Sequence, residues 1–203
     1  VVSASRDTTV KVWDAVLGGA PLATLRGHTS DVMAVAAFLV DDHGDGARIV
    51  SGGLDRTVRV WNSRGGAAAH VLRGHKGLPP TTVKGVAVFD YQCRPRLVSA
   101  HADADLRVWD GTSGALIGSL VGHSAAATAV VTFTLATGEI RAASASWDAT
   151  VRIWDVQVCK AVAVLRGHVD GVTALKTVLL PSRGVRLVSG GEDRHLCWWD
   201  AQA

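Results

Sequence analysis

The sequence predicts an all-β fold built from a repeated unit, and three observations support this prediction. A tryptophan followed by Asp or Asn recurs every 45 or 48 residues, and a period of this length is the signature of a repeat architecture. Short runs of β-branched and apolar residues, bounded by Gly, Pro and Asp, favour short strands over helices. A serine stands ten residues and an aspartate six residues before each of these tryptophans. The five units contain Ser3, Asp7 and Trp13; Ser51, Asp55 and Trp61; Ser99, Asp103 and Trp109; Ser144, Asp148 and Trp154; and Ser189, Asp193 and Trp199.

The composition narrows the class of protein. The chain has 203 residues, of which 48% are hydrophobic, so there is enough apolar material for a core. The formal net charge is only +3, and the Lys and Arg residues are scattered, which argues against a dedicated nucleic-acid surface. Cys93, Cys159 and Cys197 show no paired spacing, so we expect no disulfide framework and a reducing, intracellular compartment, cytoplasmic or nuclear.

Targeting segments are absent from the sequence pattern. No apolar stretch reaches the length of a membrane-spanning helix. The chain has no signal peptide and starts within a repeat, which leads us to expect a piece of a longer protein.

The first unit shows how the strands are arranged. Residues 9–13 follow a polar turn at residues 6–8, which predicts two short strands joined by that turn. Gly18 and Gly19 then interrupt the chain. Residues 21–25 predict an edge strand, where the missing donor of Pro21 is tolerated.

A Gly–His pair, two residues after a leucine, is the second recurring mark, and an apolar run follows each pair. The run after Gly27 and His28 contains Val32, Val35 and Phe38. Small and β-branched residues lie between these positions, which favours a strand buried on both faces over a helix. We therefore expect the innermost strands at these runs. The other three pairs are Gly74 with His75, Gly122 with His123, and Gly167 with His168.

The strand that ends at each tryptophan is apolar on both faces, as Val151 and Ile153 before Trp154 illustrate. Such a strand must be covered on both sides, so the sheets must stack. In four units a basic residue lies two positions before the tryptophan, and we expect its charge at the rim of the sheets. These residues are Lys11, Arg59, Arg107 and Arg152.

With Gly–His, Ser, Asp and Trp–Asp in units of 45 to 48 residues, the chain resembles the WD-repeat family over its whole length. The resemblance implies a β-propeller of four-stranded antiparallel blades around a central channel. Residues 1–203 would form a single partial propeller of about four and a half to five blades, an open arc or a fragment of a larger propeller. Asn62 in place of Asp, and extra residues at 76–80 that predict a loop, are departures from the pattern.

In that family the repeat is staggered against the blade, which sets the implied boundaries. Residues 1–26 would give the last three strands of one blade. Residues 29–73, 76–121 and 124–166 would give three complete blades, and residues 169–200 a blade without its outer strand. Because neither end completes the other, we expect apolar faces at both ends, where copies of the chain could self-associate.

The resemblance also implies a hydrogen-bonded group of four side chains, a structural tetrad, in each unit. Buried His and Asp are costly unless they bond to each other, and a buried indole N–H needs an acceptor. A linked group of this kind makes the sheet rigid. The implied tetrads are His28, Ser51, Asp55 and Trp61; His75, Ser99, Asp103 and Trp109; His123, Ser144, Asp148 and Trp154; and His168, Ser189, Asp193 and Trp199.

Other chemical interpretations of these residues are weaker. Ser, His and Asp are the residue types of a hydrolase triad, but the group occurs four times and no nucleophile-elbow motif accompanies it. We therefore expect no catalytic residue. His195 and Cys197 supply at most half of a zinc site, and the Gly–Gly pairs at 52–53 and 190–191 lack the lysine and helix of a phosphate loop. We expect no metal and no cofactor.

The residue directly before each tetrad aspartate varies between units, and this is where we expect specificity. The resemblance places this corner on the top face of the propeller, around the channel. Exposed Trp and Arg are typical anchors of interfaces, whereas the alternative is that Trp147 only covers a neighbouring loop. The candidate partner-binding residues are Arg6, Leu54, Ala102, Trp147 and Glu192.

The function implied by the resemblance is a non-enzymatic scaffold for protein–protein interaction, which suits many short loops on a rigid support. One alternative is a substrate- or adaptor-recognition module of a larger assembly, such as a ubiquitin ligase or a kinase- or NTPase-linked protein. Another is binding of RNA or a phosphopeptide by the top face, for which Arg6 and Arg56 are weak indications. We expect protein or peptide partners, no membrane partner, and no nucleic acid as the main partner.

Overall fold

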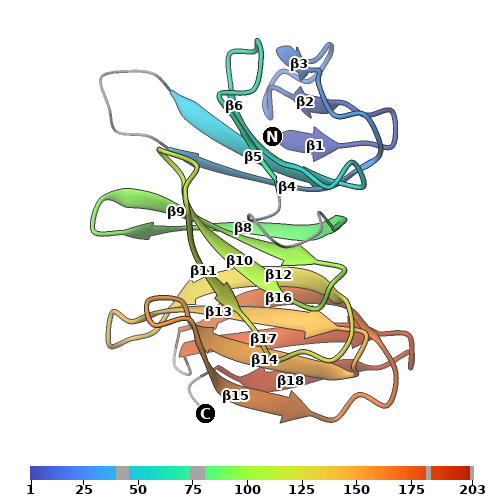
Figure 1. The fold of residues 1–203 in the computed structure, drawn as a ribbon, viewed down its shortest axis with the longest axis vertical. Coiled ribbons are helices and arrows are strands. Elements are labelled where there is room, and N and C mark those ends of the chain that lie inside the picture. Colours follow the sequence, from blue (N-terminus) through green and yellow to red (C-terminus); the bar gives the residue numbers. More distant parts are fainter. Residues whose placement is uncertain (40–45, 74–80, 182–183, 202–203) are drawn as a thin grey trace.

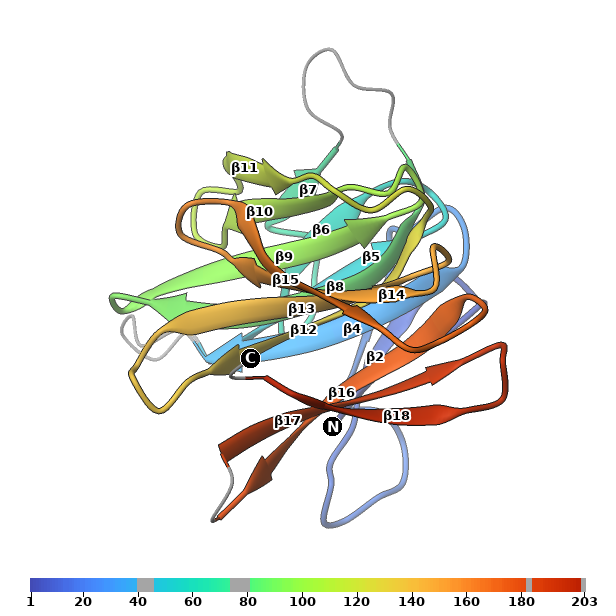
Figure 2. The same cartoon turned by 90° about the horizontal axis from the view of Figure 1, so that it is seen from below.

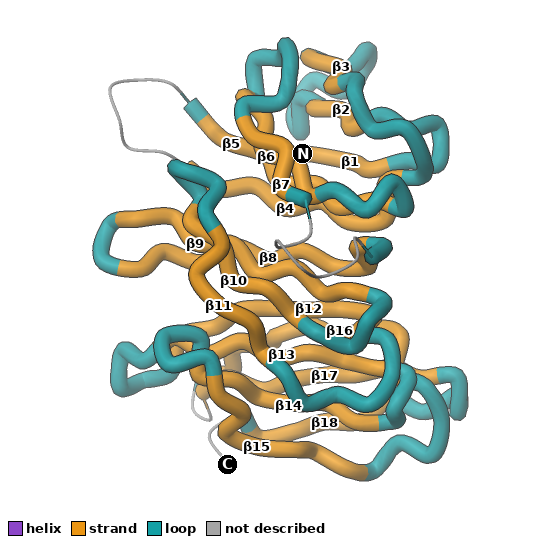
Figure 3. The backbone as a smooth tube through the Cα atoms, in the orientation of Figure 1, coloured by secondary structure: helices purple, strands orange, loops and turns teal. Residues whose placement is uncertain are grey.

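The computed structural model describes residues 1–39, 46–73, 81–181 and 184–201. Within these ranges the regular secondary structure consists of β-strands and contains no helix (Figure 3). The eighteen strands form five antiparallel sheets, and within each sheet the strands follow one another in chain order. None of the residues in these ranges forms a helix that could cross a membrane. The all-β prediction is confirmed.

Three sheets have four strands and the two end sheets have three. The first sheet contains β1 (Val2–Ala4), β2 (Val10–Val12) and β3 (Ala23–Leu25). The second contains β4 (Val32–Leu39), β5 (Ala47–Gly53), β6 (Val58–Asn62) and β7 (His70–Leu72). The third contains β8 (Val83–Tyr91), β9 (Arg94–His101), β10 (Leu106–Asp110) and β11 (Leu116–Leu120). The fourth contains β12 (Ala127–Thr134), β13 (Ile140–Ser146), β14 (Thr150–Asp155) and β15 (Lys160–Arg166), and the fifth β16 (Val172–Leu180), β17 (Gly184–Gly191) and β18 (Leu196–Asp200).

The sheets follow one another along an open arc, with the first sheet at one end and the last at the other (Figure 1). Contacts between β4 and β8, β8 and β12, and β12 and β16 show that the runs after the Gly–His pairs form the innermost strands, as predicted. In the turned view of Figure 2 the last sheet, drawn in red, forms one side of the arc. The arc agrees with the prediction of a partial propeller.

The core is divided into four clusters, one between each pair of neighbouring sheets. Each cluster includes the tryptophan of the later sheet, so Trp61, Trp109 and Trp154 pack against the sheet before them and are at most 3% exposed. Each of the second, third and fourth sheets is covered by a neighbouring sheet on both sides. This accounts for the apolar residues on both faces of its third strand. The stacking that the sequence predicted is therefore what buries these strands.

Each of the two end sheets has a neighbouring sheet on one side only. Trp13 and Trp199 are half-buried, and Leu196 and Trp198 on β18 are 74% and 61% exposed. Val1, Val16, Leu17 and Leu22 are exposed at the other end. The apolar ends that the sequence predicted are present, and self-association through them stays a prediction.

The turn that leads into the strand ending at the repeat tryptophan has the same backbone in all five sheets. The residue after the tetrad aspartate has a positive φ between 63° and 76°, in the left-handed region that non-glycine residues rarely adopt. The aspartate stabilises this turn, because its Oδ1 accepts the backbone N–H two residues further on, as Asp148 does from Thr150 at 3.0 Å. The five left-handed residues are Thr8, Arg56, Ala104, Ala149 and Arg194.

Candidate interaction site and its supporting networks

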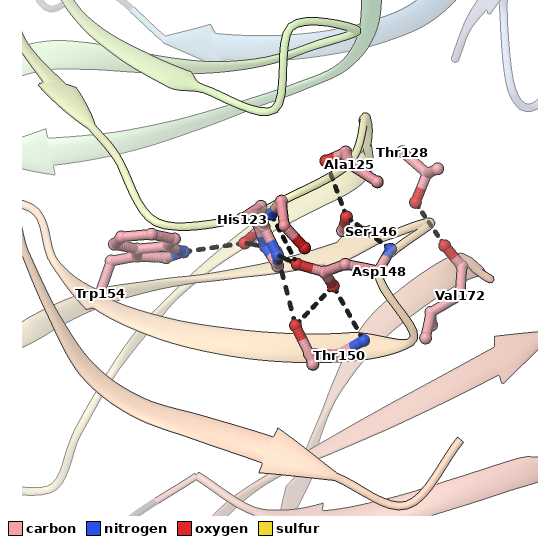
Figure 4. Close-up of polar contacts among 10 residues, drawn as sticks. His123, Ala125, Thr128, Ser146, Asp148, Thr150, Trp154 and Val172 are labelled. Atoms are coloured by element: carbon pink, nitrogen blue, oxygen red, sulfur yellow. Dashed lines mark hydrogen bonds and ion pairs between the residues drawn. The ribbon is translucent and has the colours of Figure 1, made fainter. Parts of the chain in front are cut away.

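The fourth sheet joins His123, Ser144, Asp148 and Trp154 in one hydrogen-bonded network (Figure 4). The His123 ring lies 2.8 Å from Asp148 Oδ2 through Nδ1 and 2.7 Å from Ser144 Oγ through Nε2. The indole N–H of Trp154 donates to the same Oγ at 2.8 Å. Thr150 donates its hydroxyl to Asp148 Oδ1 at 2.6 Å. Every polar atom that these residues bury thereby has a partner within the network.

The second and fifth sheets repeat this geometry. His28 lies 2.8 Å from Asp55 and 2.7 Å from Ser51, and Trp61 donates to Ser51 at 2.8 Å. His168, Asp193, Ser189 and Trp199 have the corresponding contacts, each at 2.8 Å. The structure thus brings together all four members of three implied tetrads.

The electrostatics of the network favour a neutral histidine beside an ionised aspartate. Burial lowers the pKa of His123, although Asp148 opposes this. Burial by itself would raise the pKa of Asp148, but hydrogen bonds from Thr150, His123 and the Ser124 amide outweigh it and hold the pKa at about 2. A neutral ring that donates from Nδ1 to Asp148 must accept at Nε2 from the Ser144 hydroxyl. The network therefore has one consistent direction of donation at near-neutral pH.

The third sheet is built differently. His75 lies outside the described residues, and it is His101, at the end of β9, whose Nε2 lies 2.7 Å from Ser99 Oγ. Trp109 still donates to Ser99 at 2.8 Å. Asp103 does not contact His101 by a hydrogen bond among the described residues; it accepts one from Arg107 Nη2 at 2.6 Å. Sequence reasoning missed His101.

A signal for His101 was nevertheless present in the sequence. The same position, two residues after the tetrad serine, holds Ser5, Gly53, Ser146 and Gly191 in the other units. A Cβ on Gly53 would lie 3.1 Å from Nδ1 of His28, so a large side chain here and an imidazole from the preceding loop compete for the same space. A lone histidine among small residues was thus a sign that this unit supplies its imidazole from the strand.

Arg107 corrects another expectation. Its side chain is completely buried and not at the rim, and its Nε and Nη1 have no hydrogen-bond partner among the residues that the structure describes. Arg59 and Arg152 lie over the rings of Trp61 and Trp154, with their guanidinium carbons 5.7 and 6.0 Å from the ring centroids. The stem of an arginine at this position packs over the sheet as expected, but in the third sheet the charge is buried with it.

The burial and contacts of the four tetrad serines indicate a structural role. Ser51, Ser99, Ser144 and Ser189 are each 0% exposed, and each hydroxyl already lies within hydrogen-bond distance of a histidine and an indole. A nucleophile must reach its substrate, and these hydroxyls cannot.

No group of three or more potential metal ligands occurs within residues 1–39, 46–73, 81–181 and 184–201. His195 contacts Asp193 at 3.8 Å and has a largely exposed side chain, while Cys197 is half-buried. Gly52 serves packing, because a Cβ there would lie 2.4 Å from Val83 of the next sheet. Close approach of the sheets thus accounts for this glycine.

The candidate partner-binding residues occupy one equivalent corner in successive sheets. The backbone N–H groups of Leu54, Ala102, Trp147 and Glu192 each donate to the carbonyl of the residue that precedes the inner strand, at 2.8 to 3.0 Å. Four of the five candidates are exposed and Leu54 is half-buried. The Arg6 side chain is 91% exposed and lies 3.8 Å from Asp31. All of them therefore lie at the end of the sheets where the inner strands begin.

Trp147 is the large apolar member of this corner. It is 53% exposed, and Lys84 of the third sheet places its Nζ 5.8 Å from the ring centroid. On the other side, Gly171 leaves room for the ring, because a Cβ there would lie 2.9 Å from Trp147 Cδ1. The ring thus spans from the third to the fifth sheet while half of it stays open to solvent.

The comparisons with known proteins agree with this geometry. Residues 1–14, 19–62, 114–155 and 159–200 match the family described as WD domain, G-beta repeat. The unmatched stretch between residues 62 and 114 contains the third unit, whose network departs from the others. No curated protein sequence gives a significant match.

Solved structures show the same fold. The chain is similar to the WD40 β-propeller domain of Doa1, with a TM-score of 0.75 and 21% sequence identity over 98% of this chain. It spans 60% of the length of that domain. Since the repeats match over more than half of the sequence and the sheets form propeller blades, the chain belongs to the WD-repeat family.

Proposed function

We propose that this chain is a non-enzymatic platform that binds a protein partner through the corner around Trp147. The observation that carries the proposal is a half-exposed tryptophan held between Lys84 and Gly171 on a rigid support. WD-repeat propellers generally serve as scaffolds for protein interaction. A large aromatic side chain that is already ordered loses little entropy on binding, which makes it an effective anchor.

The network below the corner supports this role. Asp148 follows Trp147 directly and is bonded to His123, Thr150 and the Ser124 amide, so the backbone that presents the ring is fixed. Ser146, on the other side, donates to the Ala125 carbonyl at 2.9 Å and accepts from the Asp148 amide at 3.0 Å. Trp147 therefore projects from a turn whose residues on both sides are held by hydrogen bonds.

Proximity labelling with the intact chain, compared between Trp147→Ala and Trp198→Ala, tests the proposal. Both tryptophans are exposed, but Trp198 lies on the open face of the last sheet. We expect Trp147→Ala to lose partners that the wild type and Trp198→Ala retain. Because about half of the ring is buried against the neighbouring sheets, we expect its removal to lower the free energy of unfolding by about 1 to 2 kcal/mol and to leave the chain folded.

The opposite result is equally clear. If Trp147→Ala keeps every partner of the wild type, the corner is not the binding site. A variant that loses partners because it no longer unfolds cooperatively would show that Trp147 supports the fold, and this too would contradict the proposal.

A further inference from the structure

A groove runs along the inner strands next to Trp147. It has a volume of about 400 Å³ and is lined by residues of β4, β8, β12 and β16. Its floor consists of small residues, since Ala34, Gly85, Ala129 and Ala174 stand at the same position of the four strands. Gly85 is required there, because a Cβ would lie 3.1 Å from the backbone nitrogen of Val130. Gly85 thus lets the inner strands β8 and β12 approach each other closely, and the groove is lined by the four inner strands together.

The charge of the groove has one sign. Lys84 and Lys176 are the charged residues in its lining, and no acidic residue lines it. Within the described part of the chain neither lysine forms an ion pair, and the Lys84 contact is with the Trp147 ring. Both ammonium groups are therefore available to an anionic partner.

Two acidic residues, Asp31 and Asp170, lie in the loops before β4 and β16 but do not line the groove. Asp31 lies 3.8 Å from Arg6, and Asp170 accepts the Gly171 amide at 2.7 Å. Glu192 is exposed at the corner of the fifth sheet but does not line the groove. The charged residues that line the groove are therefore all positive.

From these observations we infer that the groove binds an extended acidic segment of a protein partner. An apolar side chain of the segment packs on the open half of Trp147, and its carboxylates pair with Lys84 and Lys176. The inference rests on the proposed function and adds the chemistry of the partner. Two lysines and one aromatic ring suit a peptide better than a nucleic acid, which binds through many phosphate contacts and several stacked bases.

Fluorescence anisotropy with three labelled probes tests the inference on the intact chain. The probes are a short peptide with alternating Glu and Leu, the matching peptide with Lys in place of Glu, and an oligouridylate of the same length. We expect the wild type to prefer the acidic peptide. We expect affinity for it to fall roughly tenfold or more in Trp147→Ala and about twofold to fivefold in each of Lys84→Gln and Lys176→Gln.

Charge reversal and matched controls sharpen the result. The double change of Lys84→Glu and Lys176→Glu should shift the preference toward the basic peptide. Lys160→Glu, which alters an exposed lysine on the outer strand β15, and Trp198→Ala should leave affinity for the acidic peptide unchanged. Thermal melting of each variant identifies any that fail to fold, and the glutamine variants remove charge without adding repulsion.

Failure of the inference differs from failure of the proposed function. Equal binding of the acidic and basic peptides, or affinity that is insensitive to both lysines, would overturn the acidic-segment assignment. Tighter binding of the oligouridylate than of either peptide would overturn it as well. Loss of protein partners in Trp147→Ala would still stand in these cases, because that result does not depend on the charge of the groove.

Discussion

The third and fourth sheets bury the same Trp–Ser pair but complete it from opposite directions. In the fourth sheet the imidazole comes from His123, in the loop before the inner strand β12. In the third it comes from His101, two residues after Ser99 on the same strand. In both sheets an imidazole nitrogen lies 2.7 Å from the serine Oγ, once from the preceding loop and once from the serine's own strand.

The two arrangements are not equally complete. In the fourth sheet His123 ties the loop before β12 to the turn at Asp148, and Thr150 adds a hydroxyl donor. In the third sheet Asp105 takes the position of Thr150, and Asp103 accepts a hydrogen bond from Arg107. Two nitrogens of that buried guanidinium have no partner within the described part of the chain. Unpaired buried donors cost free energy, so we expect the third sheet to be the less rigid of the two.

The largest expected effect tests what the two sheets share. Trp109 and Trp154 are 3% and 0% exposed, and each donates to its serine at 2.8 Å. Trp109→Ala and Trp154→Ala should therefore each lower the free energy of unfolding by about 3 to 5 kcal/mol. Urea denaturation measures both losses, with the exposed Trp198→Ala as the control. A loss near zero for either variant would show that the shared pair does not hold its sheet.

A smaller effect tests where the sheets differ. His101→Ala and His123→Ala each leave a buried serine without its imidazole partner, so each should cost about 1 to 3 kcal/mol. His195→Ala, which removes a largely exposed imidazole, is the control and should change stability little. His75→Ala provides the direct comparison in the third unit. If it costs more than His101→Ala, the assignment of His101 to this network is wrong.

A third comparison uses the pH dependence of the third sheet. Burial, aided by Arg107 and opposed by Asp103, lowers the pKa of His101 from 6.5 to about 4. The unfolded chain therefore binds this proton first, so the stability that neutral His101 contributes is lost as the pH falls from about 6.5 to about 4. The slope is at most about 1.4 kcal/mol per pH unit for one proton.

Replacing the titrating group isolates this contribution. In His101→Gln the dependence of the unfolding free energy on pH should be shallower than in the wild type by one proton's share over that range. Urea denaturation at a series of pH values measures it. Identical slopes for the two proteins would mean that His101 titrates normally in the folded chain.

The repeat made most of the fold predictable. Three features of the sequence predicted short stacked sheets with an inner strand after each Gly–His pair. They are the period of 45 to 48 residues, the apolar faces of the Trp strands and the polar turn at each aspartate. Three of the four groups of His, Ser, Asp and Trp named from the sequence lie together in the structure. The sequence pattern predicts these groups because each repeat packs against similar neighbouring repeats, so the same residue types recur at the same positions.

The third unit shows what a repeat pattern hides. His75 keeps the position of the Gly–His histidine in the sequence, and Arg107 keeps the position of the basic residue. That His101 bonds to Ser99, and that Arg107 is buried, depend on which side chains compete for one volume between neighbouring sheets. The repeat spacing alone does not show the outcome of that competition, whereas the residue type two positions after the serine points to it.

The sequence by itself determined the kind of fold, the faces of its strands and the variable corner before each aspartate, because these follow from short-range patterns repeated five times. Only the tertiary structure decided that the corner at Trp147 is half-open and flanked by Lys84 and Gly171. Lys84 and Gly171 belong to the two neighbouring sheets, and the exposure of a side chain depends on what those sheets place beside it. The same packing left the lysine-lined groove next to Trp147 open.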